Sequence, residues 1–108
     1  MMRFLISVID TADSTGTKEE MLAIDGFNDE LRSSDSFVFA WGLTHPREAK
    51  VIDNRGEAGV QTAGPLHSSN EFVSGFWIIN AESHDQANDL AHRASLACNR
   101  TDELRQLH

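Results

Sequence analysis

The chain has 108 residues, enough for one small hydrophobic core, and we expect one domain over residues 1–108. Its formal net charge of -8 at pH 7 argues against binding to nucleic acid or anionic membranes, because both need a basic protein face. The one cysteine, Cys98, excludes an intramolecular disulfide, and no apolar run is long enough to cross a membrane, so we expect a cytoplasmic protein.

The chain begins with a predicted strand and helix. Residues 3–9 are rich in β-branched and aromatic side chains, as in a central strand, and residues 10–16 carry the Asp, Ser, Thr and Gly of a loop. Thr17 and Glu20 fit a capping box for a helix that should end near residues 33–35. Its apolar residues recur at spacings of three and four: Met21, Ile24, Phe27 and Leu31.

Residues 37–43 predict a strand with large side chains on one face and small ones on the other. Pro46 should prevent the strand from continuing, because proline cannot donate a hydrogen bond to a neighbouring strand. The large side chains should share one face: Phe37, Phe39, Trp41 and Leu43. The small side chains should share the other face, where they leave room for a helix or a ligand: Val38, Ala40 and Gly42.

The remaining elements are a hairpin, a strand, a helix and a last strand. Residues 49–53 and 58–62 flank a glycine-bearing turn and predict a hairpin at a sheet edge. Residues 72–80 give the strongest strand signal in the chain. Ser83 should cap the second helix with Gln86 completing a capping box. The final edge strand is expected at residues 103–107.

This order predicts an α+β fold. Without the inserted β-hairpin it is the ferredoxin-like split βαβ arrangement, an antiparallel sheet with two helices on one face. The other sheet face would carry Phe and Trp side chains that nothing in the chain covers. We therefore predict a homodimer packed sheet to sheet, with any cavity between the sheet and its helices or at the dimer seam.

Several short motifs resemble, in their order and spacing, the YCII-related or DGPF-domain family. They are the aromatic-to-Arg helix end at residues 27–32, Gly42-Leu43, the Gly64-Pro65 corner, the Gly-aromatic strand at residues 71–79, and Ser-x-x-x-Ala at residues 83–87. The resemblance implies a dimeric α+β barrel of ferredoxin-like halves and a largely undefined biochemical function.

The chain departs from the family at positions that the resemblance makes important. One branch of the family begins the corner with Asp-Gly-Pro-Phe, where this chain has Ala63 and Leu66 in place of the Asp and Phe. The other branch is suspected of pairing a helix histidine with an aspartate after the corner. Phe27 stands at the place of that histidine, and no Asp lies between Pro65 and Asn80, so we expect that the dyad is absent.

The candidate catalytic residues lie just after the corner. His67 could act as a general acid or base and Glu71, four residues on, could orient it. A solvated loop that happens to hold both residues is the simpler interpretation. Gly64, Pro65, His45 and Trp77 are the candidate ligand-binding residues, although a tryptophan on a strand more often packs in a core or an interface.

No histidine, cysteine or carboxylate cluster has the spacing of a metal site, so we expect neither a metal nor another cofactor. Three hypotheses remain open. The first is a homodimeric small-molecule-binding module without the dyad. The second is a small metal-free enzyme of the dimeric α+β barrel type that uses His67, and the third is a purely structural interaction module.

Overall fold

The computed structural model describes residues 1–12 and 16–108. The middle of the predicted loop at residues 10–16 therefore lies outside the described residues, and its first part belongs to a strand. The regular elements are β1 (Met2–Thr11), α1 (Lys18–Ser33), β2 (Phe37–Gly42), β3 (Lys50–Asp53), β4 (Val60–Ala63), β5 (Glu71–Ala81), α2 (His84–Cys98) and β6 (Thr101–Gln106).

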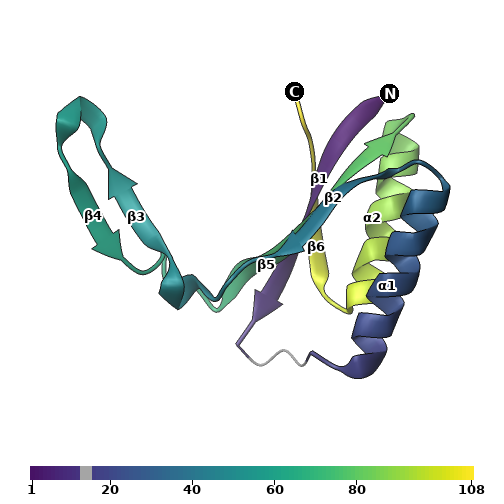
Figure 1. The fold of residues 1–108 in the computed structure, drawn as a ribbon, viewed down its shortest axis with the longest axis horizontal. Coiled ribbons are helices and arrows are strands. Elements are labelled where there is room, and N and C mark those ends of the chain that lie inside the picture. Colours follow the sequence, from purple (N-terminus) through teal and green to yellow (C-terminus); the bar gives the residue numbers. More distant parts are fainter. Residues whose placement is uncertain (13–15) are drawn as a thin grey trace.

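The main sheet is antiparallel with the strand order β2-β5-β1-β6, and both α-helices cover the same face of it (Figure 1). This is the ferredoxin-like arrangement, so the predicted fold class is confirmed. Thr17 and Glu20 form the expected capping box at α1. At α2, Ser83 accepts from the Gln86 amide as predicted, but the Gln86 side chain accepts from the Glu82 amide instead of closing the box.

The core lies between this sheet and the two helices. Its largest fully buried side chains come from the two central strands and from α1: Phe4, Ile6, Ile79 and Leu31. The helix α2 contributes a stripe of small or compact residues that lets it approach the sheet closely: Ala87, Leu90, Ala94 and Cys98. Burial of apolar surface such as this layer is the dominant favourable term in folding.

The prediction that Phe37 shares a face with Phe39 is wrong. The register between β2 and β5 shifts between these residues, so that Phe37 pairs with Ile79 and Phe39 pairs with Ile78. A β-bulge of this kind reverses the alternation of side chains. Phe37 therefore packs against the core, whereas Phe39 lies on the face of the sheet that the helices leave uncovered.

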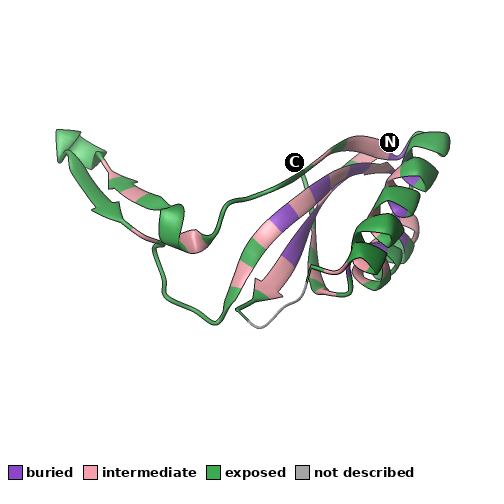
Figure 2. Ribbon diagram, turned by 60° about the horizontal axis from the view of Figure 1, so that its bottom comes forward, coloured by how far each residue is buried: buried purple, intermediate pink, exposed green. Residues whose placement is uncertain are grey.

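The sequence predicted that the hairpin of β3 and β4 lies at an edge of the sheet, but these strands do not pair with the main sheet. The hairpin forms a separate two-stranded sheet that projects as an arm from the body, and nearly all of its residues are exposed (Figure 2). At its base the Gly64 amide donates to the Ala49 carbonyl at 2.8 Å. Gly64 has φ of 94°, a conformation that favours glycine, and this corner directs the chain back to the sheet.

A thiol and a carboxylate meet where α2 passes into β6. Cys98 Sγ lies 3.4 Å from Asp102 Oδ1, and Asp102 Oδ2 is buried with no hydrogen-bond partner among the described residues. Burial raises the pKa of the Asp102 carboxyl to about 6. Burial and the nearby Asp102 charge raise the pKa of the Cys98 thiol to about 12, so Cys98 is a packing residue and not a nucleophile.

The ionised form of Asp102 should destabilise the folded state. Because its pKa is above the ordinary 3.8, the stability that it contributes is greatest below pH 3.8 and is lost as the pH rises through about 6. Asp102→Asn should therefore raise the free energy of unfolding at pH 7.5 by about 1 kcal/mol, a value reduced for partial exposure to water. Urea unfolding should show that this advantage shrinks or reverses at pH 4.5. Glu82→Gln, at an exposed position, is the control. An equal change in the free energy of unfolding by Asp102→Asn at both pH values would contradict the raised pKa of Asp102.

Candidate functional site

A cavity of about 670 Å³ lies at the base of the arm, and we call it the loop cavity. It is lined by residues 43–46, Pro65 and residues 67–73, together with Ala12 and Ala49. Apart from Ala12, which follows β1, these segments are the loop after β2, the Gly-Pro corner and the chain leading into β5 with the first residues of that strand. Tight turns at Pro46 and Gly64 bring them together, although they are up to thirty residues apart in the sequence.

The loop cavity contains four of the six residues that the sequence singled out, which are His45, Pro65, His67 and Glu71. Gly64 shapes the adjoining corner without lining the cavity, and Trp77 lies elsewhere. His45 Nδ1 accepts a hydrogen bond from the Arg47 amide at 3.1 Å, so the proton of the neutral imidazole is on Nε2. The His45 ring also packs against Phe72, with 5.2 Å between ring centroids.

His67 and Glu71 share this cavity but are not arranged as a catalytic pair. Among the described contacts, no hydrogen bond or ion pair joins the two side chains, and both residues are exposed. The Glu71 amide instead donates to Ser69 Oγ at 3.1 Å, which fixes the loop just before β5. The cavity therefore offers imidazole, hydroxyl and carboxylate groups to a ligand on a mainly apolar wall, without a base that a carboxylate already orients.

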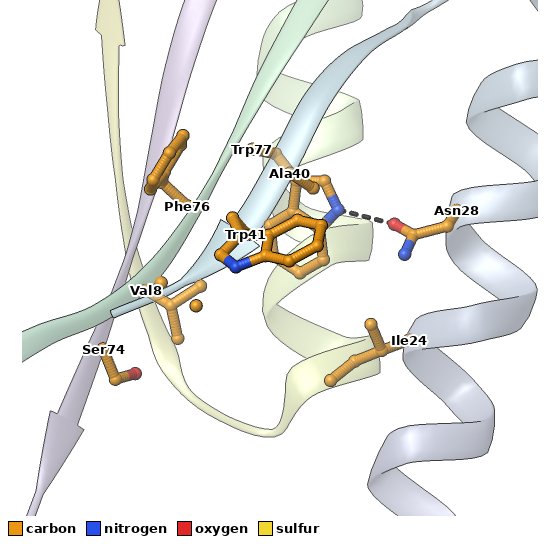
Figure 3. A pocket seen from close by; sticks show the side chains of 10 residues that line it. Val8, Ile24, Asn28, Ala40, Trp41, Ser74, Phe76 and Trp77 are labelled. Atoms are coloured by element: carbon orange, nitrogen blue, oxygen red, sulfur yellow. Dashed lines mark hydrogen bonds between the residues drawn. The ribbon is translucent and has the colours of Figure 1, made fainter. Parts of the chain in front are cut away.

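A second cavity of about 290 Å³ lies between α1 and the sheet, and we call it the inner cavity (Figure 3). Its space comes from small residues on neighbouring strands, Ala40 and Gly42 on β2 and Gly75 on β5. The sequence predicted room for a helix or ligand on this face of β2. The other described lining residues are Val8, Ile24, Asn28, Trp41, Ser74, Phe76 and Trp77.

Trp77 forms one wall of the inner cavity and is only 4% exposed. Its ring packs edge-on against Phe27, with 5.5 Å between centroids and an interplanar angle of 84°. Trp77 Nε1 donates to Asn28 Oδ1 at 2.7 Å (Figure 3). Asn28 was not among the residues predicted from the sequence, although its position four residues after Ile24, beside the apolar stripe of α1, indicates that it faces inward.

Phe27 occupies the place where the family resemblance implied a histidine. It is 5% exposed and packs in the core beside Trp77. Phe27 has no titratable group, and its ring packs against Trp77, which forms a wall of the inner cavity.

Among residues 1–12 and 16–108, no group of three or more histidine, cysteine or acidic residues is arranged to hold a metal ion. Within the same residues, neither helix has the length and apolar character needed to span a membrane.

Comparison with protein families matches residues 2–105, nearly the whole chain, to the YCII-related domain. A comparison with curated proteins gives no significant match.

The two glycines of the inner cavity should respond differently to substitution. A Cβ at Gly75 would lie 3.1 Å from the Trp41 carbonyl oxygen, which is tighter than most Cβ contacts in proteins, whereas a Cβ at Gly42 would lie 3.7 Å from the Ser74 carbonyl oxygen, an ordinary van der Waals distance. Gly75→Ala should therefore lower the free energy of unfolding by about 1–2 kcal/mol, while Gly42→Ala should change it by less than about 0.5 kcal/mol. Urea denaturation measures both variants, and equal losses would show that the close approach of β2 to β5 is not the cause.

Proposed function

The chain belongs to the YCII-related family, and we propose that it is a homodimer that binds a small molecule in the loop cavity. The observation that carries this proposal is the convergence of His45, Pro65, His67 and Glu71 on one cavity of about 670 Å³. That volume lies within the range of small-molecule sites, about 300–1,000 Å³. An apolar wall with a few polar groups is also typical of such sites.

The sheet face opposite the helices supports the homodimer, and we call it the open face. By the strand pairing it carries Leu5, Ile9, Phe39, Trp41, Val73, Phe76 and Ile78. Trp41 is 71% exposed and Phe39 is 48% exposed. Their rings stack with centroids 6.1 Å apart, and Phe76 lies 6.0 Å from Phe39. An uncovered aromatic cluster of this kind favours association, and two copies related by a twofold axis would each cover the other's cluster.

The dimer and the ligand site are connected through Val73. This residue pairs with Ile9 on the open face and also lines the loop cavity. A second copy seated on the open face would therefore border the cavity and reduce its contact with water. We propose that dimerisation completes the binding site.

A metal-free enzyme that uses His67 as a general acid or base is the second candidate. The presence of imidazole, carboxylate and two serine hydroxyls in one cavity favours it. The missing contact between His67 and Glu71 among the described residues leaves binding without catalysis as the better-supported function.

Trp41→Glu should convert the dimer into a monomer, because it places a charge in the exposed aromatic cluster of the open face. Size-exclusion chromatography with light scattering should give twice the chain mass of 12.0 kDa for the unaltered protein and one chain mass for the variant. Leu96→Glu is the matched control, since Leu96 is 83% exposed on α2, and it should remain dimeric. A monomeric unaltered protein at all concentrations would refute the homodimer.

His67→Ala and His45→Ala should each lower the affinity for ligands of the loop cavity by about tenfold. This is the loss of affinity expected when one polar contact is removed from a mainly apolar site. Ligand-observed NMR with a library of small neutral and anionic fragments would find such ligands. His92→Ala, an exposed histidine on α2, should leave their affinities unchanged. Fragments that bind all three variants equally would place the ligand elsewhere, and conversion of a bound fragment that stops in His67→Ala would favour the enzyme.

A further inference from the structure

The geometry of the inner cavity points to a second binding site, for a small neutral aromatic molecule that carries a carbonyl oxygen. No described residue lines both this cavity and the loop cavity. The inference is therefore independent of the ligand proposed for the loop cavity.

Asn28 provides the polar contact of this site. The indole N–H of Trp77 can only donate a hydrogen bond, so the Asn28 atom that faces it at 2.7 Å must be the oxygen Oδ1. The two Nδ2 protons of the same amide are then available as donors, and no hydrogen bond from Nδ2 is among the described contacts. Figure 3 shows this nitrogen on the side of the cavity where Ile24 lies. The site thus presents a donor whose orientation is already fixed, and it requires an acceptor on the ligand.

The rest of the lining determines the charge and character of the ligand. Most side chains that line the cavity with Asn28 are apolar, among them Val8, Ile24 and Ala40. No charged side chain is among the described lining residues, and the net charge of -8 disfavours anions. A carboxylate would have no counterion in this cavity, so a neutral carbonyl is the acceptor that fits.

The size and position of the cavity limit the ligand further. A volume of about 290 Å³ accommodates a molecule of one or two rings, at the lower end of the usual range for ligand sites. Trp77 offers an aromatic wall, which favours an aromatic ring in the ligand. Gly42 is exposed at the end of β2, so the cavity is accessible from this edge of the sheet.

Two probes of similar shape test the inference in the full chain. Acetophenone carries a carbonyl oxygen, and ethylbenzene does not. The chain has two tryptophans, so 15N-labelled protein gives two indole N–H signals in NMR, which Trp41→Phe assigns. Acetophenone should shift the Trp77 indole and Asn28 amide signals saturably, and it should bind about fivefold more tightly than ethylbenzene.

Asn28→Asp separates the donor from the shape of the site. The substitution keeps an oxygen acceptor for Trp77 and replaces the Nδ2 donor with a second oxygen. Acetophenone should then bind about fivefold more weakly or worse, while the affinity for ethylbenzene changes by less than about twofold. An unchanged affinity for acetophenone, or equal losses for both probes, would overturn the role of Asn28.

Gly42→Val tests the cavity itself and does not depend on how well Asn28→Asp folds. The added side chain has room at the backbone and should fill the mouth of the cavity, so both probes should bind about tenfold more weakly. Ala63→Val, at an exposed strand position on the arm, is the control and should change neither affinity. No saturable shift in the unaltered protein would refute the site. A loss of acetophenone binding in His67→Ala would place the probe in the loop cavity instead.

Discussion

The structure depends on one constraint, which is that a sheet with two apolar faces has only one layer of helices. The central strands β1 and β5 carry large apolar side chains on both faces, so Ile6 and Trp77 point toward the helices while Phe76 and Ile78 point the opposite way. The helices α1 and α2 bury the first group. A domain of two packed layers normally covers every apolar face, and this chain alone leaves one face in water. The proposed association of two copies would cover that face.

The same constraint explains where the cavities lie. Both are lined by residues from the first part of β5 and from the last part of β2 or the loop that follows it, and these are the two strands from which the chain departs into the arm (Figure 1). The small residues Ala40, Gly42 and Gly75 leave the space of the inner cavity on one face of the sheet. On the other side, Val73 links the loop cavity with the open face. Ligand binding and association are therefore expected to influence each other.

Much of the fold could be predicted from the sequence because local patterns agree with the final structure. The capping box at Thr17 and the alternation in β1 and β5 place these elements correctly, and the turn residues at Pro46 and Gly64 lie between the segments of His45 and His67, which line one cavity. The position of Phe37 on the face opposite to Phe39 could not be predicted, because one extra residue in a β-bulge cannot be recognised in a short alternating sequence. The Asn28–Trp77 hydrogen bond joins residues 49 apart in the chain, and only the tertiary packing selects it.

Quenching of tryptophan fluorescence by acrylamide can reveal whether a second copy covers the open face. Trp77 is buried within the chain, whereas Trp41 is exposed in one copy and would be shielded in a dimer. If two copies associate through this face, both tryptophans should resist acrylamide at high protein concentration, and only Trp41 should become accessible after dilution below the dissociation constant. Quenching of Trp41 that is strong and unchanged at every protein concentration would contradict this association.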